Sequence, residues 1–277
     1  MAKINEEARK KYFEIIAPYK KIISGINDKE RRLEAVINSN KTGEPYKRLT
    51  LINYNLTVVS YEILMNALSV SLLGIKNETI LNDARKTCYK TVINLERVFT
   101  SLLDVPFTDY EDALKAIASF PELKRYELIR KTGLSITFVK ESFGENSRWK
   151  WSFVELEARL ATVAKNSLNL KTLLQGMDLR SEGHRERIEF FNLTRKMLQK
   201  AADEYRLKYE VSTNRMDDFQ IAINYLGALR RLSVLLGRQK ESIILKRKIE
   251  LWKDKMEKDQ KNRARSSQLK AASPKTD

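Results

Sequence analysis

Long apolar stripes with a period of three to four residues dominate this sequence. The clearest stripe consists of Ile80, Ala84, Cys88, Thr91, Leu95, Val98 and Leu102. These positions share one face of a helix. Sheet proteins need many turns, and turns consume Gly and Pro, yet the 277 residues include only nine Gly and five Pro. The sequence therefore predicts an all-α fold, a multi-helix bundle of about seven to nine helices that are mostly antiparallel because the connections are short.

Glycine and Asx residues mark several expected helix ends. A helix from about residue 46 to 73 is expected to stop at Gly74, and Asn77 then caps a helix that continues to about residue 103. The capping box Asn27–Glu30 predicts the start of a separate short helix that ends near residue 38. Gly133 is expected to end another short helix.

Residues 134–153 carry a conflict between two secondary structures. Ser135–Val139 and Trp149–Phe153 both alternate apolar and polar side chains on either side of a Gly-containing turn, which is typical of a β-hairpin. The apolar stripe that begins at Trp149 continues at helical spacing as far as Val163. We favour the helix because this stripe is longer than the alternating pattern.

Two apolar rows that are out of phase occupy the C-terminal part of the chain, which is expected to form one last, long, basic helix after Asn214. The first row runs from Ala222 to Leu236. The second row consists of Leu245, Ile249, Trp252 and Met256. The step of nine residues between the rows places them on different sides of one helix. We therefore expect the second row to project from the body and to bind a protein partner or a second copy, although it could instead fold back onto the N-terminal helices.

This interpretation sets the expected domain organisation. Residues 1–243 are predicted to form a single helical-bundle domain that begins with a basic segment, residues 1–40. Residues 244–277 are predicted to form a basic helical extension that ends in a disordered tail from about residue 266, where the composition changes to Ser, Ala, Lys and Pro.

Positive charge is concentrated at both ends of the chain, whose formal net charge is +16. Residues 230–275 contain 15 basic and 5 acidic residues, whereas residues 49–229 contain 25 basic and 23 acidic residues. The expected contacts to an anionic partner are Arg247, Lys248, Lys253, Lys255 and Lys258. Acids interleaved with these cations are equally typical of a solvated helix that compensates its own charge.

The sequence offers little for catalysis or metal binding. One histidine, His184, and one cysteine, Cys88, cannot form a zinc cluster or two His-containing iron motifs. No P-loop, dinucleotide-binding glycine pattern or nucleophile elbow is present. We therefore expect no enzyme activity, no metal, no cofactor and no small-molecule substrate.

Glu62 is the one carboxylate in the most apolar region, Leu49–Ile75. That region is long enough to span a bilayer, but an acid at its centre is costly in lipid. The sequence therefore favours a central bundle helix over a transmembrane segment. If Glu62 is buried, we expect its pKa to be raised and its carboxylate to pair with a Lys or Arg.

These features favour a binding role over a catalytic one. The N-terminal residues lack the apolar stretch of a signal peptide, so we expect a cytoplasmic protein. The leading hypothesis is a non-enzymatic helical scaffold or protein–protein interaction protein within a larger assembly. The alternative is a nucleic-acid-binding protein that uses its basic termini.

Overall fold

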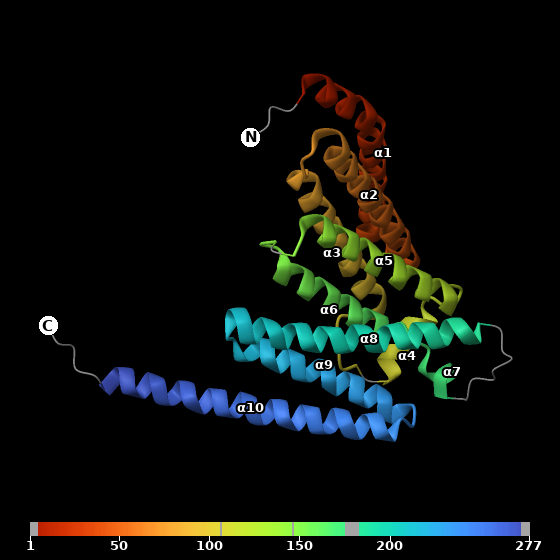
Figure 1. Cartoon of the computed structure of the whole chain (residues 1–277). Coiled ribbons are helices and arrows are strands. Elements are labelled where there is room, and N and C mark those ends of the chain that lie inside the picture. Colours follow the sequence, from red (N-terminus) through yellow and green to blue (C-terminus); the bar gives the residue numbers. More distant parts are fainter. Residues whose placement is uncertain (1–4, 106, 146, 175–182, 273–277) are drawn as a thin grey trace. The chain divides into compact units, whose positions relative to one another are not determined.

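The computed structural model describes residues 5–105, 107–145, 147–174 and 183–272 (Figure 1). Within these ranges the chain forms ten α-helices and one π-helical turn, and no strand. This architecture confirms the prediction of an all-α fold built from long helices.

The chain divides into two compact units. The first comprises Met1–Asn169 together with Arg185–Phe190, and the second comprises Leu170–His184 together with Phe191–Asp277. The boundary near residue 170 lies inside residues 1–243, which we expected to form a single domain, and residues from 244 onward belong to the second unit.

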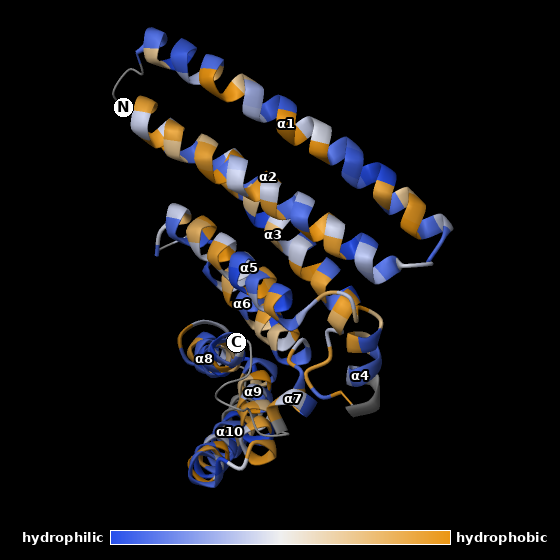
Figure 2. Ribbon diagram, turned by 90° about the vertical axis from the view of Figure 1, so that its right-hand side faces the viewer, coloured by the Kyte–Doolittle hydropathy of each residue, from blue (hydrophilic) through white to orange (hydrophobic). Residues whose placement is uncertain are grey.

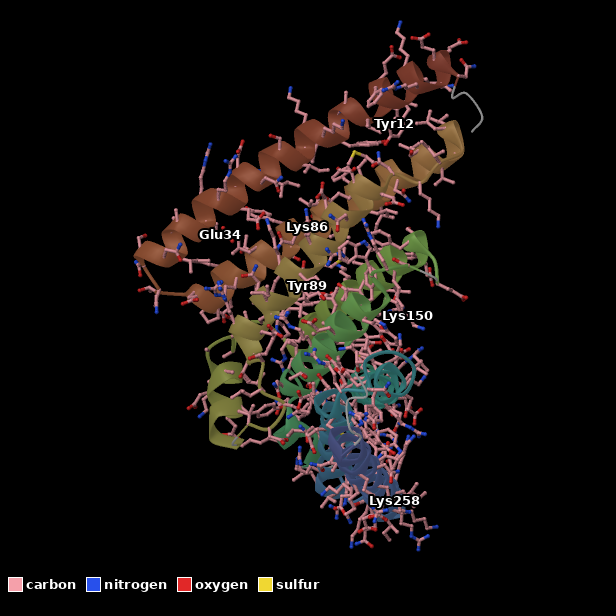
Figure 3. All side chains as sticks on the ribbon, turned by 90° about the vertical axis from the view of Figure 1, so that its left-hand side faces the viewer. Tyr12, Glu34, Lys86, Tyr89, Lys150 and Lys258 are labelled. Atoms are coloured by element: carbon pink, nitrogen blue, oxygen red, sulfur yellow. The ribbon has the colours of Figure 1, made fainter. Side chains whose placement is uncertain are left out.

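The first helix of the first unit, α1, runs without a break from Glu6 to Ser39, so the prediction of a separate helix beginning at Asn27 is wrong. Asn27, the predicted cap, lies inside this helix, and the neighbouring Asp28 carboxylate pairs with the Arg31 side chain one turn further along. Tyr12 is buried between α1 and the next helix, where its hydroxyl donates a hydrogen bond to the carbonyl oxygen of Met65 at 3.3 Å (Figure 3).

Helices α2, Glu44–Leu73, and α3, Glu78–Phe99, follow as a pair joined by a tight turn, and α1 lies beside α2 (Figure 2). Gly74 ends α2 in the left-handed conformation at φ 68°, and the Asn77 side chain accepts a hydrogen bond from the Ile80 amide at 3.1 Å. Both predicted boundaries are confirmed. Helix α3 ends at Phe99, earlier than expected, and Thr100 follows at φ 78°.

The remaining helices of the first unit are α4, Phe107–Lys115, α5, Glu122–Phe143, and α6, Lys150–Asn166. Helices α5 and α6 both pack against α3. The helical interpretation of the region after Trp149 is confirmed, and a β-hairpin is excluded. Gly133 lies inside α5 rather than at its end, because the apolar spacing continues beyond it to the buried residues Ile136 and Val139.

The second unit contains α7, Leu170–Leu174, most of α8, His184–Lys208, the π-helical turn η1, Tyr209–Thr213, and two further helices. These are α9, Met216–Leu235, and α10, Gln239–Ala272. Helices α9 and α10 fold back on each other as a hairpin (Figure 1). Helix α10 continues to Ala272, past the expected start of a disordered tail at about residue 266, and residues 273–277 of that tail lie outside the described residues.

Candidate interaction surfaces

The predicted projecting row on α10 is part of the core of the second unit. Leu245 and Trp252 are each 5% exposed, and Ile249 and Met256 are half-buried. The indole ring of Trp252 lies 5.9 Å from the ring of Phe219 on α9, centroid to centroid. The expectation that this row projects into solvent is therefore wrong, and the reason for assigning a partner contact to it falls away.

A turn explains the step of nine residues between the two rows. Gly237 adopts a left-handed conformation at φ 66° and reverses the chain between α9 and α10. The rows therefore belong to two helices rather than to two sides of one helix. The reversal lets Trp252 pack on the neighbouring helix of the same unit.

The five cations proposed for an anionic partner fall into two groups. Lys248 pairs with Asp203 at 2.9 Å, and Lys255 pairs with Glu210. The other three are exposed and form no ion pair within the described part of the chain: Arg247, Lys253 and Lys258. Only these three are free to contact a partner without breaking an existing ion pair.

Exposed apolar side chains flank the connection between α9 and α10. Val234 and Leu235 end α9 and are 54% and 47% exposed, and Ile243 and Ile244 in the second turn of α10 are 53% and 65% exposed. We call these four residues the hairpin tip. Sequence reasoning missed the hairpin tip because it treated residues 222–256 as a continuous helix.

A groove in the first unit lies between α1 and α2. Its volume is about 480 Å³, and its apolar and aromatic lining includes Leu33, Val36 and Tyr54. The basic side chains that line it are Lys29, Arg32 and Lys47. Sequence reasoning placed excess positive charge in this segment but could not locate the groove, because α1 was expected to be broken at Asn27.

The second unit has a larger groove of about 670 Å³ along α8, with charges of both signs. Two of its charged groups are already paired within the unit: Arg195 pairs with Glu241, and Asp203 pairs with Lys248. This mutual neutralisation leaves the groove without a clear preference for a ligand of either charge.

Four buried polar residues form a row along α2. They recur at intervals of seven residues: Arg48, Asn55, Glu62 and Ser69. Arg48 donates a hydrogen bond to the side-chain oxygen of Asn94 on α3 at 3.0 Å. Asn55 is fully buried, and neither of its side-chain polar atoms has a hydrogen-bond partner among the described residues. Such groups destabilise a fold unless water or another partner satisfies them.

Glu62 is buried, but the expected ion pair is absent from the described residues. The nearby ammonium group of Lys90 instead pairs with Glu30 at 3.3 Å. Burial raises the pKa of Glu62 from 4.5 to about 8, and the negative charge of Asp83 adds to the rise, while a hydrogen bond with Thr87 and the charge of Lys90 oppose it. The carboxyl group is therefore mostly protonated at neutral pH.

Two further observations bear on chemistry. Cys88 is buried, and burial together with the charge of Glu62 raises the pKa of its thiol to about 12, so the reactive thiolate is scarce at neutral pH. Among the described residues, no group of three or more His, Cys, Asp and Glu side chains is arranged to hold a metal ion.

Helix α2 is the one helix in the described ranges that is long and apolar enough to span a bilayer, and 39% of its most apolar stretch is buried.

Comparison with known proteins places the chain in a family. No curated protein matches the chain, and no solved structure matches it. The model of the TP0443 family matches residues 8–260, from the second residue after the start of α1 to a point within α10. Because this match covers most of the 277 residues, the chain belongs to the TP0443 family.

Proposed function

We propose that this protein is a non-catalytic, cytoplasmic helical scaffold that binds a protein partner within a larger assembly. The observation that supports this most directly is the hairpin tip, where Val234, Leu235, Ile243 and Ile244 are all about half exposed or more. Exposed apolar side chains are costly in water, at roughly 25 cal/mol per Å² of apolar area. Four such side chains on either side of one turn, at Gly237, favour a contact with another chain.

The charge near the hairpin tip supports association with an acidic surface. Arg247 is exposed, forms no ion pair among the described residues and lies one helical turn from Ile243 and Ile244. Apolar groups supply most of the affinity in such an interface, whereas flanking charges raise the association rate and set the orientation. We therefore expect the association rate to fall as the salt concentration rises, whereas the dissociation rate of the complex should change little.

Substitutions at the hairpin tip test the proposed function. The double variant Leu235→Lys, Ile244→Lys should lose the proteins that co-purify with the wild-type chain from its native host, and also any self-association seen by light scattering. Val211→Lys is a matched control, since Val211 is 62% exposed in the same unit but lies in η1. Equal recovery of partners by both variants would contradict the proposal.

Nucleic-acid binding is the second candidate, and three exposed cations of α10 favour it: Arg247, Lys253 and Lys258 form no ion pair in the described ranges. If they contact phosphates, the affinity for single-stranded DNA or RNA must fall steeply between low and physiological salt. The triple substitution of these residues by Glu should abolish that binding. Binding that is absent or insensitive to salt would remove this candidate.

A further inference from the structure

The groove between α1 and α2 has an apolar floor that is accessible from solvent. Val36 on α1 is 45% exposed, and Leu33 and Tyr54 lie beside it in the lining. Tyr46, at the start of α2, is held in place because its hydroxyl accepts a hydrogen bond from the Ser119 amide at 3.1 Å. The lining residues of α1 span positions 29 to 36, which rise about 10 Å along the helix axis, or about two turns.

The rim of this groove is positively charged without local compensation. Lys29, Arg32 and Lys47 line it, and none forms an ion pair among the described residues. The Lys47 ammonium group donates a hydrogen bond to the Asn40 carbonyl oxygen at 3.0 Å, which is a neutral partner.

The acids next to the lining residues in the sequence are paired or lie on another face of the helix. Asp28 pairs with Arg31, Glu30 pairs with Lys90, and Glu44 pairs with Arg48. Glu34, the remaining acid in this part of α1, is offset by nearly half a helical turn from the lining positions. The three rim cations therefore give the groove an uncompensated positive potential.

We propose that this groove binds an acidic amphipathic helix of a partner protein. Two neighbouring helices present a groove that accepts a third helix by ordinary side-chain packing. The apolar residues of the incoming helix, spaced at i, i+3, i+4 and i+7, would contact Leu33, Val36 and Tyr54. Its Asp and Glu side chains would face Lys29, Arg32 and Lys47. The apolar floor favours a protein helix over a nucleic acid, which would bind mainly through phosphates.

The test measures fluorescence anisotropy of labelled probes with the full chain. The main probe is a synthetic amphipathic peptide of about 18 residues, or five helical turns, with Leu on one face and Glu on the other. Three comparison probes isolate its features: the same peptide with Lys in place of Glu, a scrambled peptide of the same composition, and an oligothymidylate. The acidic amphipathic peptide should bind at least about tenfold more tightly than each of these, a difference of about 1.4 kcal/mol.

Two variants locate the binding, each with a matched control. Val36→Lys removes the apolar contact but keeps the positive charge, and its control is Val70→Lys, because Val70 is also 45% exposed on a helix of the same unit. Arg32→Glu reverses one rim charge, and its control is Lys21→Glu, at an exposed position of α1 outside the groove lining. Val36→Lys and Arg32→Glu should each weaken binding of the acidic peptide at least about tenfold, whereas the controls should change it by less than about twofold.

Several results would overturn the proposal. Equal binding of the scrambled peptide shows a non-specific electrostatic contact, and an oligothymidylate that displaces the peptide shows a polyanion surface. Unchanged binding by Val36→Lys, or no binding of the acidic peptide at all, also overturns it. If Val36→Lys fails to fold, Arg32→Glu remains decisive because Arg32 is exposed and forms no ion pair among the described residues. The groove belongs to the first unit and the hairpin tip to the second. The experiments on the two surfaces are therefore independent: either proposal can be contradicted while the other holds.

Discussion

The indole ring of Trp252 on α10 packs against the ring of Phe219 on α9, with their centroids 5.9 Å apart. The Arg206 guanidinium lies 5.2 Å and the Lys248 ammonium 4.8 Å from the indole centroid, so cations from α8 and α10 cover the ring as well. Trp252 therefore joins three helices of the second unit. From the sequence, Trp252 was expected to contact a partner, but in the structure it is a core residue.

Truncating Trp252 should destabilise the second unit. Trp252→Ala removes a large buried side chain, and such changes typically cost about 3–5 kcal/mol. Leu251→Ala is the control, since Leu251 is 67% exposed, and it should change the free energy of unfolding by less than about 0.5 kcal/mol. Urea denaturation followed by far-ultraviolet circular dichroism measures both values. Similar values for the two variants would contradict the packing described for α10.

Glu62 should make stability depend on pH. Its pKa is raised from 4.5 to about 8 in the folded chain, so between these values the folded state holds a proton that the unfolded state releases. The free energy of unfolding should therefore fall as pH rises through this window, by up to about 1.4 kcal/mol per pH unit, and level off above it.

Glu62→Gln tests this dependence because glutamine has a similar shape and does not titrate. The variant should be more stable than the wild type at pH 8, and its stability should vary less between pH 5 and pH 8. Glu34→Gln, at an exposed position on α1, is the control and should keep the wild-type slope. A Glu62→Gln variant with an unchanged slope would show that the carboxyl group is solvated.

The thiol of Cys88 should be inert in the folded protein. It is 2% exposed, and its pKa is raised to about 12, so both access and thiolate formation are limited. Ellman's reagent should react with less than one thiol per chain at pH 8 under native conditions, and with one thiol after denaturation in urea. Rapid stoichiometric reaction of the native protein would contradict the burial of Cys88.

Two Gly→Ala substitutions should act in opposite directions. Gly237 has φ 66°, and a Cβ there would meet no atom within 4 Å, so Gly237→Ala should destabilise by about 1–2 kcal/mol through backbone strain alone. Gly25 lies inside α1 with equally open space around it, so Gly25→Ala should stabilise by about 0.5–1 kcal/mol. Thermal denaturation of both variants compares them. The same sign for both would contradict either the turn at Gly237 or the continuity of α1.

The sequence predicted those features that depend on local signals. Gly74 and Asn77 fix their helix ends through their own backbone and side-chain hydrogen bonds, so local patterns were sufficient. Asn27 was misjudged and the turn at Gly237 was overlooked. Asn27 lies within a helix despite its capping box, and Gly237 turns the chain without a neighbouring Pro. The out-of-phase rows on either side of Gly237 were the available signal for that turn.

The candidate surfaces were less predictable than the fold. The groove needs α1 to be continuous and to lie beside α2, and neither property follows from the spacing of Lys29, Arg32 and Lys47. The hairpin tip likewise exists only because α9 and α10 reverse at Gly237. Buried apolar rows can be identified from periodicity, whereas grooves and exposed patches depend on which helices pair.

Photo-crosslinking in the native host can detect a partner protein in contact with the hairpin tip. A photoreactive amino acid replaces Ile244, which is 65% exposed, and in a control chain it replaces Val211, which is 62% exposed in the same unit. We expect one or a few discrete crosslinked products at Ile244 and none of these at Val211, with mass spectrometry identifying a second protein chain in each product. Identical products at both positions, or none at Ile244 under conditions where the chain is abundant, would contradict the proposed contact.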